Sequence, residues 1–163
     1  MNPRVAPLAD LYNLNTNLVN KTLKNLADDV AHKRVNDKGS SLHWIIGHIA
    51  NSRHYVGGLF NAGTEFENSE LYNGGTPLKE PSAYPPIAEI KKIFENVSGK
   101  FMKRLGELTD DDINKKLESK LPVKDETMLG GNCIFQPSRE LPCRTVEFYQ
   151  KTAGNGWFDG ISR

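Results

Sequence analysis

The sequence predicts an all-α protein, an up-and-down four-helix bundle whose fourth helix is doubtful or degraded. Apolar residues recur at three- and four-residue steps in residues 7–32, 40–59 and 87–108, which is the pattern of helices that bury one face. A short polar connection between the first two segments favours antiparallel neighbours. Three such helices need a fourth to close the core, and the sequence that should supply it does not have the pattern of a helix.

The first segment predicts one helix over residues 7–32. The second begins after Ser40 and Ser41, which are typical N-cap residues, and predicts a helix to residue 59. The apolar stripe of the first segment consists of Leu8, Leu11, Tyr12, Leu18, Val19, Leu23, Leu26 and Val30, and that of the second consists of Leu42, Ile45, Ile49, Val56 and Phe60.

Residues 61–86 contain an Asn-Gly-Gly run and four prolines, so we expect a long loop within one domain. Such a loop either covers one end of a pocket or is an inert crossover. The third segment, residues 87–108, has an unbroken apolar stripe. After it, Thr109 and three aspartates predict a cap and an acidic first turn for a short helix to residue 117.

His48 is the candidate functional residue of the second helix. At about 100° per residue, the stripe centred on Ile45 and Ile49 carries His48 to the inward flank and leaves His43 and His54 on the far side. One interpretation is a histidine at the edge of the core, hydrogen-bonded to a neighbour. The other is a metal ligand, because neutral imidazole is the commonest protein ligand for transition metals. A catalytic site of the zinc type needs about three protein ligands, so other residues must contribute.

Composition excludes several classes of function. The net charge of +1, with acids and bases interspersed, shows no basic footprint for nucleic acid. No apolar run approaches the length of a membrane span, and the opening residues do not have the pattern of a signal peptide. Cys133 and Cys143 are the only cysteines and form no metal-type pair, so we expect a cytoplasmic protein without a disulfide framework.

Residues 130–163 form an atypical tail after a bundle unit of residues 1–129. Pro137 and Pro142 each disfavour a continuous helix, and glycines at 154, 156 and 160 interrupt the end. Local and global signals disagree only in this part of the chain.

The second helix, with the run W-I-I-G-H-I-A-N-S-R around His48, resembles the DinB-like superfamily of metal-binding four-helix bundles. The resemblance covers residues 7–129, including the long crossover and the short capped helix. It implies that His48 is the first ligand of a site for a divalent metal of the zinc or nickel type. In that family a His-x-x-x-His pair on the last long helix completes the site. Members of known activity are mostly thiol-dependent transferases or isomerases, which implies a small-molecule or thiol substrate and allows a homodimer.

The chain departs from this family because it has no histidine after His54. A change of reading frame explains the departure. Reading the codons from Gly131 onward one base later permits an amphipathic, proline-free string that contains H-E-S-Y-H, with its histidines overlapping Ser138 and Pro142. We therefore hypothesise that the tail is an out-of-frame translation. As written, the chain has His48 alone, with Cys133 and Cys143 as conceivable replacement ligands or with no metal at all.

Two functions follow from these observations. The first is a metal-dependent enzyme of the thiol transferase or hydrolase type, impaired because two of its three histidine ligands are missing. The second is a non-catalytic helical bundle that acts as a binding or dimerisation module, with a purely structural His48.

Overall fold

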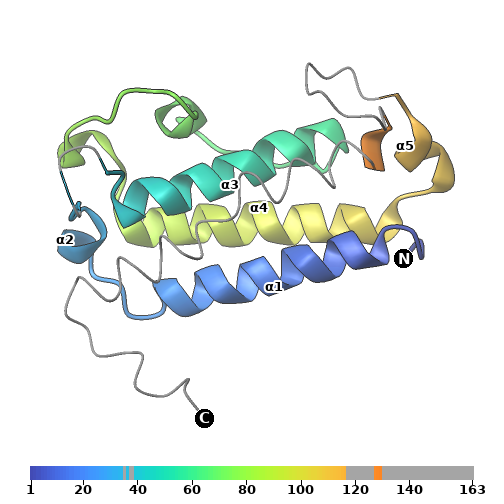
Figure 1. Ribbon diagram of the computed structural model, residues 1–163, viewed down its shortest axis with the longest axis horizontal. Coiled ribbons are helices and arrows are strands. Elements are labelled where there is room, and N and C mark those ends of the chain that lie inside the picture. The colour runs from blue at the N-terminus through green and yellow to red at the C-terminus, as the bar shows by residue number, and fades with distance from the viewer. Residues whose placement is uncertain (35, 37–38, 117–126, 130–163) are drawn as a thin grey trace, which may run out of the picture.

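The computed structural model describes residues 1–34, 36, 39–116 and 127–129, and this part of the chain is all-α. The long helices are α1 (Ala6–Leu23), α3 (Leu42–Leu59) and α4 (Ile87–Glu107), and the short ones are α2 (Asp28–Ala31) and α5 (Asp110–Asn114). The three long helices lie side by side along the longest axis of the molecule, and α4 packs against both α1 and α3 (Figure 1). The predicted all-α bundle is confirmed.

The directions of the long helices differ from a simple up-and-down order at one step. The start of α1, with Leu8, shares a core cluster with Val56 near the end of α3 and with Phe101 near the end of α4. Thus α1 runs antiparallel to both other helices, whereas α3 and α4 are parallel (Figure 1). The reason is the crossover of residues 61–86, which is long enough to return the chain to the end at which α3 begins.

The first helix is shorter than its apolar pattern predicted. α1 ends at Leu23, and after a turn and an extended Ala27 the chain forms the separate helix α2, so a single helix over residues 7–32 is wrong. The break places the Asp28 carboxylate 2.7 Å from the backbone N–H of Ile87, which it accepts as a hydrogen bond. The first N–H groups of a helix have no partner within it. This tertiary bond at the start of α4 therefore stabilises the broken arrangement.

The N-cap of α3 and the extent of α4 agree with the sequence prediction. Ser41 is the N-cap of α3, and its hydroxyl accepts the N–H of Trp44 at 3.2 Å. α4 begins directly after Pro86 and ends at Glu107, one residue before the predicted end. Both are local features, which is why the sequence alone reveals them.

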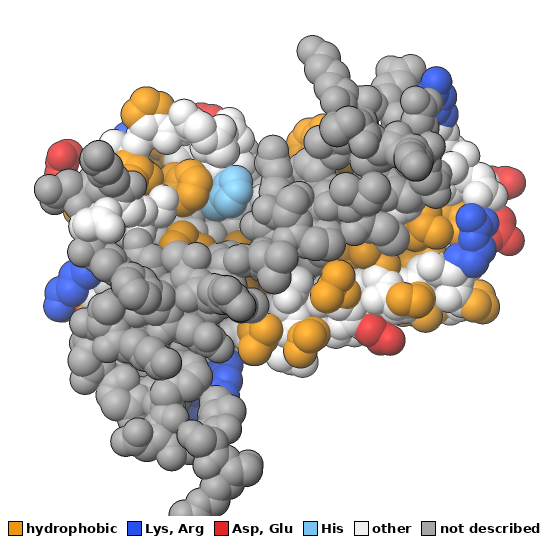
Figure 2. All heavy atoms as spheres, in the orientation of Figure 1, with side chains coloured by type: hydrophobic (Ala, Val, Ile, Leu, Met, Phe, Trp, Pro, Cys, Tyr) orange, Lys and Arg blue, Asp and Glu red, His pale blue; other side chains and the backbone are white. Residues whose placement is uncertain are grey.

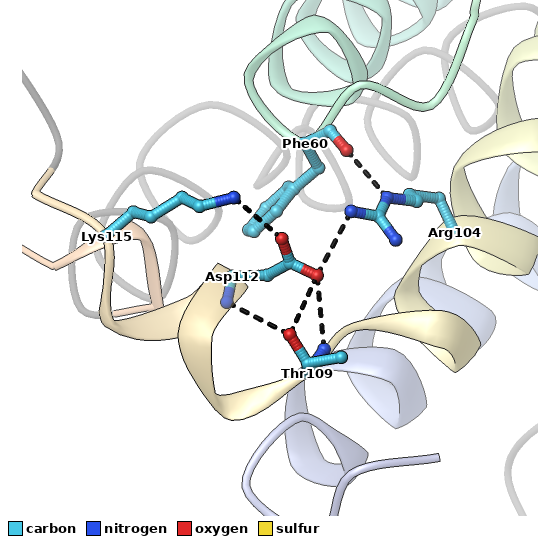
Figure 3. Close-up of polar contacts among 5 residues, drawn as sticks. All are labelled: Phe60, Arg104, Thr109, Asp112 and Lys115. Carbon is cyan, nitrogen blue, oxygen red and sulfur yellow. Dashed lines mark hydrogen bonds and ion pairs between the residues drawn. The ribbon is translucent and has the colours of Figure 1, made fainter.

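The short helix α5 begins at the predicted cap (Figure 3). Thr109 and Asp112 form a capping box, in which each side chain bonds the backbone N–H of the other residue. The helix ends at Asn114 rather than at the expected residue 117, which itself lies outside the described residues.

Asp112 also connects α5 to the ends of α3 and α4 (Figure 3). Its carboxylate accepts hydrogen bonds from Lys115 at 2.9 Å and from Arg104 of α4 at 3.2 Å. The Nε of Arg104 in turn donates to the carbonyl oxygen of Phe60, the C-cap of α3, at 2.8 Å. We call these residues, with Thr109, the Asp112 network. The hydrogen bonds from Lys115 and Thr109 hold the pKa of Asp112 well below its ordinary range.

The crossover is a loop, as predicted, and it contains two short 3-10 helices, η1 (Ser69–Tyr72) and η2 (Pro81–Ala83). Phe66 and Tyr72 are buried with Ile46 and Ile90 in the core cluster at the end where α3 and α4 begin. The loop therefore covers the first half of α3.

One face of α1 leaves apolar side chains in solvent. Leu11, Leu14 and Leu18 recur at steps of three and four along the helix and are 36%, 56% and 40% exposed. Figure 2 shows hydrophobic side chains at the surface along this helix. None of the helices in the described part of the chain combines the length and the hydropathy that a membrane span requires.

Candidate metal centre

His48 lies on the second turn of α3 and is half-buried. Its Nδ1 atom is 2.7 Å from the carbonyl oxygen of Tyr72 in η1. A backbone carbonyl can only accept a hydrogen bond, so Nδ1 carries the proton and donates it. The neutral ring has one proton, and its lone pair is therefore on Nε2. A metal-ligating histidine almost always donates its other ring N–H to a carbonyl or carboxylate in this way.

The plane of this ring is set by Trp44, one turn earlier on α3. The two rings are stacked with centroids 4.9 Å apart and an interplanar angle of 7°. The indole Nε1 donates to the carbonyl oxygen of Leu71 at 3.2 Å, so the indole is itself held in place by the crossover. Both the tilt and the tautomer of His48 thus depend on residues 71–72.

The crossover continues past His48 along α3. Asn51 donates from Nδ2 to the Oδ1 of Asn73 at 2.9 Å, and a Cβ built on Gly74 would lie 3.5 Å from Cε1 of His48. The crossover therefore lines the His48 ring, and its covering one end of a pocket stays a prediction.

His43 is the histidine that the structure buries most deeply, and the prediction that it faces away from the core is wrong. Its side chain is 0% exposed, and its ring stacks on His32 with centroids 4.3 Å apart. Nε2 lies 2.7 Å from the carbonyl oxygen of Pro85, just before α4. The apolar stripe of α3 did not reveal this burial, because the covering residues come from α2 and the crossover. His54 is half-buried beside Thr64.

Sequence reasoning also missed Arg53, which is 1% exposed between the three long helices. Its Nη1 donates to the hydroxyls of Thr16 on α1 and Ser98 on α4, at 2.6 and 2.8 Å. Its guanidinium lies over the ring of Phe94, 4.8 Å from the centroid. The available signal was its position four residues after Ile49, which places it within the buried stripe.

The described residues do not assemble a metal site around His48. Among them, no three His, Cys, Asp or Glu side chains lie close enough to hold an ion together. Cys133 and Cys143, and the positions at which the shifted frame would place histidines, lie outside the described residues. One imidazole with a free Nε2 is therefore the whole of the predicted site in the part of the chain that the structure describes.

The protein is a helical bundle with a long crossover between α3 and α4. One histidine of α3, His48, is hydrogen-bonded to that crossover. The family model of the DinB superfamily matches residues 11–134, which is most of the chain. The chain belongs to the DinB superfamily. Searches of curated proteins and of solved structures return no match for it.

Proposed function

We propose that this chain derives from a metal-dependent enzyme of the thiol transferase or hydrolase type. With the present sequence of residues 130–163, this enzyme activity is impaired. Membership of the DinB superfamily supports the descent. The impairment follows from the ligand count, because the chain has no histidine after His54 and the described residues bring no three candidate ligands together.

The observation that carries the proposal is the hydrogen bond from Nδ1 of His48 to the Tyr72 carbonyl oxygen. It leaves the Nε2 lone pair unprotonated, which is the state that a metal ligand requires. We therefore take His48 as the first of three ligands, a zinc- or nickel-type ion as the lost cofactor, and a small thiol or other small molecule as the substrate.

A second candidate function is a non-catalytic binding or dimerisation module. It is favoured by the stacking of His48 on Trp44, because that contact and the Tyr72 bond together account for the position of the ring without any ligand. In this case the exposed leucines of α1 would be the functional surface rather than His48.

Metal analysis distinguishes the two functions. We compare the chain as written with a chain in which the reading frame is shifted by one base from residue 131, and we introduce His48→Ala into each. After exposure to nickel or zinc and removal of free ion, we expect about one ion per shifted-frame chain, far less for the chain as written, and loss of the ion in His48→Ala.

The matched control is His54→Ala, which removes another half-buried histidine of α3 and should leave the bound metal unchanged. A shifted-frame chain that folds and binds no ion contradicts the proposed descent and favours the binding module. The coding DNA across residues 129–136 tests the frame itself, since a clean read with no better shifted frame removes the explanation for the missing ligands.

A further inference from the structure

Residues 71–73 are fastened to one face of α3 by three hydrogen bonds in register. The donors Trp44, His48 and Asn51 are four and three residues apart, so they lie on the same side of the helix. The acceptors are consecutive, namely the carbonyl oxygens of Leu71 and Tyr72 and the side chain of Asn73. We call this arrangement the 71–73 clamp.

The depth of the clamp is set by Gly47, the residue before His48. A Cβ built at position 47 would lie 2.1 Å from Cε1 and 2.2 Å from Cδ1 of the Tyr72 ring, far closer than real Cβ atoms approach other atoms. The Tyr72 ring therefore rests on α3 at a position that has no side chain. The conformation of Gly47 is ordinary helix, so the need for glycine here is purely one of space.

The Tyr72 ring cannot move aside freely. It is 0% exposed, with Phe66, Tyr84 and His43 packed around it at centroid distances of 5.5, 5.6 and 6.1 Å. Protein interiors are close-packed, so a ring enclosed on several sides transmits a displacement to its own backbone. The backbone in question carries the carbonyl oxygen that holds His48.

We propose that Gly47 is a positioning residue for His48. By admitting the Tyr72 ring against α3, it places the Tyr72 carbonyl 2.7 Å from Nδ1, keeps the ring proton there and leaves the Nε2 lone pair free for a ligand. This inference rests on the proposed function for the identity of the ligand, whereas its claim about the imidazole concerns this chain alone.

The test is the tautomer of His48, measured on the metal-free full chain by long-range ¹H–¹⁵N NMR. We record spectra at about pH 8.5, roughly two units above the reference pKa of histidine, so that imidazoles are neutral. The His48 signals are assigned by their loss in His48→Gln. We expect the wild-type ring to show only the Nδ1–H pattern and the Gly47→Ala ring to lose that exclusivity and show both tautomers.

The matched control is Gly58→Ala on the same helix, because a Cβ built on Gly58 meets no atom within 4 Å. It should leave the Nδ1–H pattern intact. If Gly47→Ala does not fold, as judged by its helical circular dichroism, Tyr72→Ala replaces it. That variant removes the ring and leaves α3 unchanged, and it should also release the carbonyl and mix the tautomers.

An Nε2–H pattern in the wild type overturns the inference. An exclusive Nδ1–H pattern in a folded Gly47→Ala chain, or in Tyr72→Ala where that variant replaces it, also overturns the inference. These results are separable from the metal experiment. A correct tautomer response with no metal bound by the shifted-frame chain removes the proposed function only. Metal binding through His48 with an unchanged tautomer in Gly47→Ala removes the positioning role only.

Discussion

Two histidines on α3 hold their ring protons on opposite nitrogens. His43 donates from Nε2 to the Pro85 carbonyl, so its lone pair is on Nδ1, which has no hydrogen-bond partner among the described residues. His48 donates from Nδ1 and has its lone pair on Nε2. The same residue type thus adopts two tautomers on one helix. His43 is a buried core residue, whereas the unprotonated Nε2 of His48 is the atom to which we assign the proposed metal ligation.

We expect His43 to make folding sensitive to acid. Burial lowers its pKa, an effect partly opposed by the Pro85 hydrogen bond. The unfolded chain then takes up this proton before the folded protein does. The contribution of neutral His43 to the free energy of unfolding is complete above about pH 6.5 and is lost as pH falls through the lower folded pKa. For one proton, the free energy of unfolding changes by at most about 1.4 kcal/mol per pH unit.

Urea unfolding at about pH 8 and about pH 5.5 measures this effect, since the loss of stability between them should be smaller in His43→Gln than in the wild type. His54→Gln, which alters a half-buried histidine of the same helix, should retain most of the wild-type loss. Equal losses in the wild type and His43→Gln would show that the buried ring does not contribute.

At the scale of the element, the Asp112 network joins the last turn of α4, α5 and the C-cap of α3. The capping box itself was predictable, because it depends on residues three apart. The contact of Arg104 with both Asp112 and Phe60 was not predictable, because it depends on where the parallel helices α3 and α4 end in space.

We expect Asp112→Asn to lower the Tm at neutral pH, because it removes a carboxylate stabilised by Lys115, Thr109 and Arg104. The folded pKa of Asp112 is depressed, so its contribution is present above the unfolded pKa of about 4 and is lost as pH falls further. The Tm difference from wild type should therefore narrow in acid.

Asp111→Asn is the control for this experiment. It removes the same charge from the same turn, and its side chain makes none of these network contacts. A Tm that falls equally in both variants would indicate a general charge effect at the helix start rather than the network.

At the scale of the whole molecule, Arg53 connects all three long helices through Thr16 on α1 and Ser98 on α4. We expect Arg53→Ala to reduce the free energy of unfolding by about 2–4 kcal/mol, because it leaves a cavity and removes the hydrogen-bond donor to the Thr16 hydroxyl and the buried Ser98 hydroxyl. Chemical denaturation measures the change.

Arg34→Ala is the matched arginine. It removes an exposed hydrogen bond to the carbonyl oxygen of Lys79 and should change stability by no more than about 0.5 kcal/mol. Similar effects of the two substitutions would contradict the role of Arg53 as a connection between helices.

The three long helices and the N-cap of α3 could be predicted because their signals are local. α4 shows this best, since each turn contributes an apolar residue to one face. Three features could not be predicted, because each depends on a partner supplied by another element. They are the break after Leu23, the burial of His43 and the interior position of Arg53. His48 lies between these cases. Its helix was predictable, whereas its tautomer depends on Tyr72, which is 24 residues away.

The solvent-facing leucines of α1 also affect how this protein can be handled. Leu11, Leu14 and Leu18 expose apolar surface to water. Burying that surface would be favourable by about 25 cal/mol per Å². Salts that are excluded from protein surfaces, such as sulfate, strengthen the tendency of such area to associate. Concentrated samples should therefore precipitate early in ammonium sulfate, and dilute chloride buffers suit this protein better.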